Sequence, residues 1–378
     1  MTQAEEPLYW DWNATTPPHP DVLAVMQEAW REAWANSSSQ HRLGRAARAR
    51  IEAVREQIGA LLAVHPRDVL FVASGTEANN LALRHAAGLV VSRLDHPSVV
   101  RVAEQRAAEG APVVWVAVPP SGRLDPREIA SCLDTLPEPI RARSVVVITA
   151  ANHETGVLQD VTDLGSLVRE RGARLHCDAS QAIGKVAASQ LSGADSWTIS
   201  AHKIRGPQGV AALAWSGAPP TPVLLGGSQE RGLRPGTPPG PLIAGFGAAL
   251  ARLDVARYAR VEPLRDRFEA AVRSHAWVNG EGAPRLPHVS NMSFAGWTGE
   301  RLVAALDVRG VCVSTGSACR VGTAEPSAAV AAMSGAERAK GAVRASLGED
   351  ADEAQLERAL AQLLPLLTLQ REGACSNA

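Results

Sequence analysis

Short apolar runs alternate with segments of helical spacing along the first two thirds of the chain. The apolar runs are bounded by Gly, Pro, Asp or Ser and predict strands, whereas apolar residues three and four positions apart predict helices. The predicted strands cover residues 68–73, 89–94, 112–118, 144–150, 174–177, 197–199 and 210–215. The predicted helices cover residues 21–36, 45–64, 78–85, 97–109, 126–136 and 164–171. This alternation is typical of an α/β domain with a mainly parallel sheet.

The last third of the chain predicts a smaller α+β unit. Helices are predicted up to residue 275, over 299–308 and over 353–366, and strands over 288–294, 311–313 and 342–346. A long helical region starts near Leu242, and the change of pattern around residues 255–263 indicates a domain boundary. We therefore expect an N-terminal arm at 1–16 that packs with the small domain, a large domain at 17–256 and a small C-terminal domain at 257–378.

Composition excludes several classes of protein. A length of 378 residues fits two domains with a large core. A net charge of -1 and a pI near 6.8 give no reason to expect nucleic acid as a partner. The first residues lack the pattern of a signal peptide and no apolar stretch is long enough to span a membrane, so we expect a cytoplasmic protein. Five cysteines without paired spacing or nearby His clusters predict reduced thiols and no metal site.

Lysine is rare in this chain. Among 38 basic residues only Lys185, Lys203 and Lys340 are lysines. An amine can lose its proton and form a carbon–nitrogen bond, which a guanidinium cannot do, although all three could be ordinary exposed charges. Lys203 follows the apolar run 197–199 and precedes a Gly-Pro turn, so we expect it where a strand ends. Ligands bind at the carboxyl ends of strands in open α/β sheets.

Residues 74–77 read S-G-T-E and stand between a predicted strand and a predicted helix. The free backbone N–H groups and the positive end of the helix dipole make such a turn an anion site, and a phosphate fits it. Ser74 and Glu77 also match a capping box, so an ordinary helix start is the alternative.

The segment around Lys203, S-A-H-K-x-x-G-P-x-G, resembles the cofactor-lysine motif of the cysteine desulfurases, pyridoxal 5'-phosphate-dependent enzymes of the class V aminotransferase family. The resemblance extends from about Tyr9 to about Leu364. It implies the aminotransferase-like fold (fold type I), an α/β architecture with a large domain on a mainly parallel, seven-stranded sheet and a smaller α+β C-terminal domain. It also implies a homodimer.

The resemblance implies the contacts of the cofactor phosphate. In the S-G-T-E turn, Gly75 and Thr76 would bind it, and Ser200 and His202 beside the lysine would join them. The segment G-G-S-Q-E-R-G-L-R-P-G-T ends at Thr237, which would bind the phosphate of the partner subunit. The amine of Lys203 would form the carbon–nitrogen bond to the cofactor.

The resemblance also implies contacts to the cofactor ring. His96 would lie flat on the ring and contribute to catalysis. Asp178, in H-x-D-A-x-Q, would pair with the pyridinium nitrogen and keep the ring able to accept electrons, whereas an exposed loop Asp is the alternative. Gln181 would contact the phenolic oxygen. At His153 the family pattern N-N-E-T-G has Asn, and an imidazole can also donate one hydrogen bond, so the role would survive in altered form.

Three further residues are assigned to the substrate. Cys319 lies in G-S-A-C, in a small polar loop that would keep its thiol accessible, and adjacent Arg320 favours the thiolate. It would be the nucleophile that accepts sulfur. Arg344 would grip the substrate carboxylate in a two-point fork, and Asn13, in the opening W-N-A-T-T-P, would also bind the substrate.

The resulting hypothesis is a cysteine desulfurase that converts L-cysteine to L-alanine and leaves the sulfur as a persulfide on Cys319. The acceptor would be another protein, either a scaffold for iron–sulfur clusters or a thiolation enzyme. Two rivals stand beside it. One is another class V enzyme, such as a selenocysteine lyase or an aminotransferase, and the other is a non-catalytic homologue that binds a partner.

Overall fold

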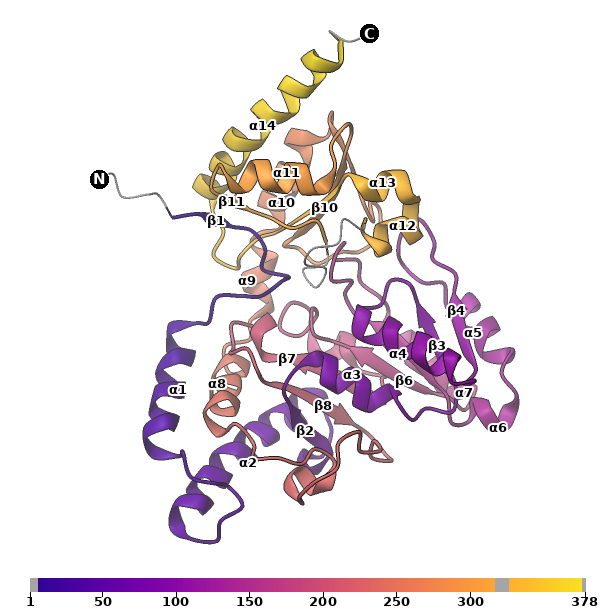
Figure 1. The fold of residues 1–378 in the computed structure, drawn as a ribbon, viewed down its shortest axis with the longest axis vertical. Helices are drawn as coiled ribbons and strands as arrows, with labels where there is room; N and C mark the ends of the chain where they lie inside the picture. The colour runs from indigo at the N-terminus through magenta and orange to yellow at the C-terminus, as the bar shows by residue number, and fades with distance from the viewer. Residues whose placement is uncertain (1–5, 317–325, 376–378) are drawn as a thin grey trace.

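A seven-stranded sheet forms the centre of the larger part of the molecule (Figure 1). The computed structural model describes residues 6–316 and 326–375, with side chains up to residue 368. The strand order is β2-β8-β7-β6-β5-β3-β4, and β8 runs antiparallel to both of its neighbours while the strands from β7 to β4 are parallel. The strands are β2 (Val69–Val72), β3 (Leu89–Ser92), β4 (Val113–Val116), β5 (Val145–Thr149), β6 (Arg174–Asp178), β7 (Ser196–Ser200) and β8 (Ala211–Trp215).

Helices cover both faces of this sheet, which confirms the predicted α/β fold. Along β5, Val145 and Val147 pack in the apolar cluster that includes α3 and α4, whereas Val146 and Ile148 pack in the cluster that includes the other helices. Strand residues alternate between the two faces, so a strand buried on both sides is apolar throughout. The helices are α1 (Pro20–Glu32), α2 (Arg42–Leu62), α3 (Gly75–Leu83), α4 (Pro97–Ala108), α5 (Pro126–Asp134), α6 (Glu138–Arg141), α7 (Val161–Glu170) and α8 (Gly240–Leu250).

The C-terminal part has a hydrophobic core of its own. Its sheet has the order β12-β10-β9 and is antiparallel. Its elements are α9 (Val255–Ala259), α10 (Glu262–Val272), β9 (Ala276–Val278), β10 (Val289–Phe294), α11 (Gly299–Asp307), β11 (Val311–Cys312), α12 (Ala328–Ser334), α13 (Ala336–Lys340), β12 (Ala342–Ser346) and α14 (Glu353–Cys375).

The start of the chain packs on this C-terminal core. Strand β1 (Leu8–Tyr9) pairs in parallel with β11 (Figure 1). The Trp10 ring meets the Phe268 ring edge to face at 5.4 Å between centroids. Residues 11–16 then run past the larger part, where Thr16 donates its backbone N–H to the His202 carbonyl at 3.0 Å. The arm therefore contacts both cores.

Several short elements of the described structure were not predicted, among them β1, β9, α6, α12 and α13. Strand β9 has three residues and α6 has four, which is too short for a periodic pattern. Helices α12 and α13 lie in an Ala-rich stretch interrupted by Gly335 at φ +87°. Their sequence therefore does not distinguish an apolar helix face from a polar one. No helix within residues 6–316 and 326–375 combines the length and the apolar character that a membrane span needs.

Candidate active site

A pocket of about 190 Å³ lies at the carboxyl ends of strands β5, β6 and β7. Eleven of the thirteen predicted site residues line it. Its lining residues are Asn13, Ala14, Ser74, Gly75, Thr76, Asn79, His96, Ser98, Thr149, His153, Asp178, Ser180, Gln181, Ser200, His202, Lys203 and Arg344. These side chains come from both ends of the chain and from five connections of the large sheet. The sheet thus collects them at the edge where ligands bind in open α/β folds.

Lys203 is the last residue of a 3₁₀ turn, η3 (Ala201–Lys203), which follows β7. Its Nζ donates to the carbonyl oxygens of Asn13 at 2.5 Å and Ala14 at 2.8 Å. The turn is tight, because a Cβ at Gly206 would come within 2.7 Å of the Ala201 carbonyl oxygen. The glycine therefore lets the chain fold back and aim the amine into the pocket.

The first turn of α3 forms a small cradle. Ser74 caps the helix, since its Oγ accepts from the Glu77 backbone N–H at 3.2 Å. A Cβ at Gly75 would meet Ser200 Oγ at 2.7 Å and Ser180 Oγ at 3.5 Å, so only a glycine leaves room for the two hydroxyls. The capping role and the anion site therefore coexist, and the cradle offers backbone N–H groups and hydroxyls to a phosphate.

His202 borders the cradle as a neutral ring. Burial, followed by the positive charges of Lys203 and Lys185, lowers the pKa of His202 to about 4. Its Nδ1 lies 3.1 Å from Thr15 Oγ1. At neutral pH the ring can donate one hydrogen bond without adding charge.

Asp178 ends β6 and is only 6% exposed. Its Oδ2 accepts from Asn79 Nδ2 at 2.9 Å, and its Oδ1 accepts from the Ser180 backbone N–H at 3.0 Å. Asn79 is oriented in turn by Ser98, whose Oγ accepts from the same Nδ2, and by His176. The carboxylate is thus a buried group held at a defined position, and the alternative of an exposed loop Asp is wrong.

His96 caps α4 and points its ring into the pocket. Its Nδ1 accepts from the Ser98 backbone N–H at 3.1 Å. Burial lowers the pKa of His96, the Asp178 carboxylate raises it in part, and Lys203 lowers it. We assign the neutral tautomer with the proton on Nε2, because Nδ1 is the acceptor.

His153 lies beside His96, with the ring centroids 5.3 Å apart and the planes at 70°. Its Nε2 is 3.5 Å from Glu154 Oε1. Its backbone carbonyl accepts from Asn13 Nδ2 at 3.1 Å and from Arg344 Nη1 at 2.8 Å. The imidazole therefore lines the pocket while the backbone ties the arm to the C-terminal part.

Arg344 lies on β12 and is 2% exposed. Its Nη2 donates to Asp11 Oδ1 at 2.5 Å. Its Nε is buried and has no hydrogen-bond partner among the described residues. The guanidinium therefore lies at the pocket with a donor still to be satisfied, as a site for a carboxylate requires.

Two predicted residues do not line this pocket. Thr237 is exposed, on the connection between β8 and α8. That connection is anchored by the buried pair of Arg55 and Glu230, at 2.7 Å, and Glu230 Oε2 also accepts from the Phe71 backbone N–H. Cys319 lies outside the described residues.

The described residues on either side of Cys319 meet at Glu154. Ser327 donates its hydroxyl to the Glu154 carboxylate, and a Cβ at Gly316 would lie 2.5 Å from Glu154 Oε2. Glu154 is itself buried and follows His153 in the chain. Gly316 and Ser327, the described residues near either end of the part of the chain that carries Cys319, therefore both lie beside Glu154.

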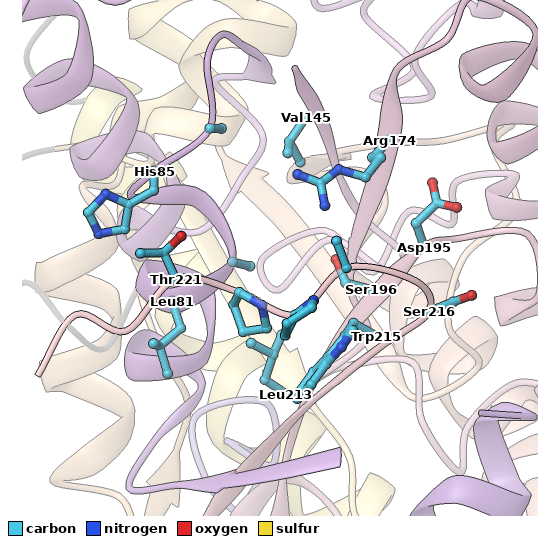
Figure 2. Close-up of a pocket in the computed structure, with 15 residues that line it drawn as sticks. Leu81, His85, Val145, Arg174, Asp195, Ser196, Leu213, Trp215, Ser216 and Thr221 are labelled. Atoms are coloured by element: carbon cyan, nitrogen blue, oxygen red, sulfur yellow. The ribbon is translucent and has the colours of Figure 1, made fainter. Parts of the chain in front are cut away.

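A second pocket, of about 80 Å³, lies at the opposite edge of the sheet (Figure 2). Val145, Arg174 and Ser196 line it, and they begin strands β5, β6 and β7. Leu81 and His85 border it from α3 and the residues just after it (Figure 2). None of the predicted site residues lines this pocket, so the candidate active site is the one at the carboxyl edge.

Comparison with known families agrees with this geometry. The family model described as aminotransferase class-V matches residues 8–359. The chain belongs to this class V aminotransferase family. It is 35% identical over 369 residues to a cysteine desulfurase of a Nostoc species, a match that covers 93% of this chain and 91% of that protein.

Solved structures of similar proteins share the class V fold seen here. A NifS-like protein superposes with a TM-score of 0.86 and 29% identity, over 96% of this chain and 100% of the other. SspA in complex with cysteine superposes with a TM-score of 0.76 and 27% identity, over 90% of this chain and 98% of the other.

Several residues that line the candidate pocket or contact its lining were missed from the sequence. They are Asn79, Ser98, Thr149, Ser180 and Lys185. Asn79 offered one signal, because it is a polar residue on the buried face of α3. The others carry no motif, and only the three-dimensional contacts reveal them.

Proposed function

We propose that this class V protein is a pyridoxal 5'-phosphate-dependent cysteine desulfurase, which converts L-cysteine to L-alanine and passes the sulfur to an acceptor protein. The observation that carries the proposal is the convergence of one lysine amine, one buried carboxylate and one anion cradle in a single pocket. The similarity to named cysteine desulfurases over more than nine tenths of the chain supports the substrate.

The pocket fits the cofactor group by group. The cradle at Gly75, with Ser200 beside it, is shaped for the phosphate because a side chain at residue 75 would fill it. Asp178 offers a buried carboxylate to the ring nitrogen, and His96 lies where a ring could stack. When bound, pyridoxal phosphate supplies a conjugated ring that takes up the electron pair released at the substrate Cα.

The protein side chains bind the substrate and move its proton. Lys203 lies within reach of the cofactor site, and its amine, once neutral, accepts the proton from the substrate Cα. Arg344 lines the pocket and binds the substrate carboxylate, and Asn13 holds the lysine through its carbonyl oxygen. Burial lowers the pKa of His96 and so favours its neutral ring, which adds no further positive charge beside Lys203 and Arg344.

Cys319 completes the reaction. Its thiolate attacks the sulfur of L-cysteine, a sulfur–sulfur bond forms, and the carbon–sulfur bond of the substrate breaks. The substrate thiol proton passes to that carbon and Lys203 returns its proton to Cα, which gives L-alanine, and the sulfur stays on Cys319 as a persulfide anion. An acceptor protein, a cluster scaffold or a thiolation enzyme, then takes the sulfur by thiol exchange.

The assembly we propose is a homodimer in the cytoplasm, in which Thr237 completes the phosphate site of the partner. Three consecutive apolar residues, Val223, Leu224 and Leu225, are exposed just before the segment that carries Thr237. Trp30 and Trp34 are also exposed. Apolar side chains in such a group favour a protein interface. We retain the division into an arm at 1–16, a large domain at 17–256 and a small domain at 257–378.

The test uses L-cysteine with the wild type and with Cys319→Ser. The wild type is expected to form L-alanine and to add one sulfur to the peptide that carries Cys319, measured by mass spectrometry. A serine hydroxyl has no anion near neutral pH, so the variant should keep the visible absorption of the cofactor but lose both products by about 100-fold or more. Alanine and sulfide released at the wild-type rate by Cys319→Ser would instead identify a lyase.

A further inference from the structure

Lys185 is buried behind the wall of the active-site pocket, although lysine is almost always exposed. It follows Gln181 by four residues in the turn after β6, and its side chain is only 2% exposed. Burying a charged amine costs free energy unless nearby groups compensate. Its surroundings should therefore show what it does.

The amine of Lys185 holds one end of the Gln181 side chain. Its Nζ donates to Gln181 Oε1 at 3.3 Å. The other end of the same amide, Nε2, donates to the Asn13 carbonyl at 2.8 Å. An amide has one accepting and one donating end, so a lysine on the oxygen fixes which end faces Asn13. That carbonyl also accepts from Lys203, so Lys185 is linked to the reactive amine through two residues.

The remaining neighbours of Lys185 are aromatic or weakly charged. Its Nζ lies 5.6 Å from the centre of the Tyr258 ring, and the His288 ring lies against Tyr258 with the centroids 4.7 Å apart and the planes at 58°. His288 Nε2 returns to Asn13 Oδ1 at 3.0 Å. The charged groups that act on Lys185 are Lys203, which opposes its charge, and Glu349, which favours it.

The two lysines influence each other's charge. Burial, followed by the charge of Lys203, lowers the pKa of Lys185 to about 7. The positive charge of Lys185 in turn helps to lower the pKa of His202 and that of His288. Coulomb repulsion is mutual, so a charged Lys185 disfavours a proton on the nitrogen of Lys203 as well.

We propose that Lys185 is a positioning residue of the active site, which orients the Gln181 amide toward Asn13 and disfavours a positive charge on the Lys203 nitrogen. The proposal rests on the desulfurase function proposed above. It makes Lys185 a second amine that tunes the reactive one and does not itself contact substrate or cofactor.

The test measures the pH at which the visible absorption of the bound cofactor changes. Lys185→Met removes the charge and the donor, and Lys185→Gln removes the charge but keeps a donor for Gln181. Both variants should shift the midpoint upward by about one pH unit, because a proton near Lys203 is no longer opposed. Lys185→Arg keeps the charge and should leave the midpoint at or below that of the wild type. Lys340→Met, at an exposed lysine, is the matched control.

Measuring how fast the cofactor is lost separates the two effects of Lys185, which are the orientation of the Gln181 amide and the repulsion of a charge on Lys203. During dialysis Lys185→Met should lose the cofactor several-fold faster than the wild type, and Lys185→Gln should be partly rescued because it can still hold the amide. Thermal unfolding shows which variants fold, and Lys185→Gln serves if Lys185→Met does not. An unchanged midpoint in a folded neutral variant overturns the proposal. A wild type that binds no cofactor overturns the desulfurase proposal itself, and this one with it.

Discussion

Asn13 joins more parts of the active site than any other single residue described above. Its carbonyl accepts from Lys203 and Gln181, and its side chain binds the His153 carbonyl and His288. Asn13 therefore ties the N-terminal arm to the candidate active site through both Lys203 and Gln181.

Lys203→Ala should abolish the covalent link to the cofactor. The other lysines cannot replace it, since Lys185 is directed at Gln181 and Lys340 is paired with Glu337. Borohydride reduction followed by peptide mass spectrometry should find the cofactor on the wild-type peptide that contains Lys203 and on no peptide of the variant. Lys340→Ala is the control and should label as the wild type does. A reduced cofactor recovered from Lys203→Ala would contradict the assignment.

At the scale of elements, the start of α3 combines an ordinary helix cap with the candidate phosphate cradle. The Ser74 cap fixes where the helix begins, and Gly75 leaves the space that the hydroxyls of Ser180 and Ser200 enter. The helix dipole adds a favourable potential for an anion at the same place. The cradle depends on β6 and β7 as much as on α3, because Ser180 follows the end of β6 and Ser200 ends β7.

Gly75→Ala should weaken cofactor binding by about tenfold or more, because the new Cβ would stand 2.7 Å from Ser200 Oγ and fill the cradle. Equilibrium titration of the apoprotein with pyridoxal phosphate measures the change. Adding Ser200→Ala should restore part of the affinity by removing the crowded hydroxyl. Gly240→Ala is the control, since a Cβ there meets nothing closer than 3.7 Å. Full affinity in Gly75→Ala would exclude the cradle as the phosphate site.

The elements in which apolar and polar positions alternate clearly were predicted from the sequence. The elements without a clear apolar pattern were missed. Strand β5 is an apolar run closed by polar residues, and α2 has clear helical spacing, so their patterns were sufficient. Strand β9 is too short to show a period. The contacts of Asn79 and Lys185 could not be predicted. A polar residue within an apolar pattern indicates burial, but the pattern does not identify the distant side chain that it contacts. The resemblance assigned Asn13 and Arg344 to the substrate. The structure places both residues in the lining of one pocket.

At the scale of the whole molecule, the exposed apolar group before the Thr237 segment bears on assembly. Leu225 is 93% exposed, which is costly in a chain that stays monomeric. Leu225→Asp should weaken the dimer by about tenfold or more, as read from sedimentation velocity over a range of concentrations. Val308→Asp is a matched control, because Val308 is 86% exposed in the C-terminal part. A wild type that sediments as a monomer at high concentration would contradict the proposed homodimer.

Acid should destabilise the folded protein. Burial lowers the pKa of five histidines, and four of them, His96, His176, His202 and His288, lie in the core or at the pocket. Below the ordinary histidine pKa near 6.5, these four sites therefore bind more protons in the unfolded chain than in the folded one. Asp95 opposes this, because burial raises its pKa to about 7 and the folded state binds that proton first. Four minus one leaves at most three protons. The free energy of unfolding should therefore fall by up to about 4 kcal/mol per pH unit between pH 6.5 and 4.

Thermal unfolding at pH 7 and pH 5 measures the effect, and the melting temperature should be lower at pH 5. The sign follows from linkage, since stability is lost as pH falls through the ordinary histidine pKa toward the lowered values. His176→Gln should reduce the slope by about one proton, because His176 is fully buried and its pKa is lowered to about 4. Equal melting temperatures at both pH values would mean that the buried histidines do not control acid stability.

The N-terminal arm contacts elements near the C-terminus, and these contacts decide when the arm can pack during synthesis of the chain. Asn13 donates its backbone N–H to Ser346 Oγ at 3.0 Å, and β1 pairs with β11, so the anchors of the arm are made by the ribosome long after the arm itself. A nascent chain that ends before β12 already contains the cradle, Asp178 and Lys203. It lacks the strand that holds Asn13 against the lysine. The arm can therefore take its place beside Lys203 only after nearly the entire polypeptide has been synthesised.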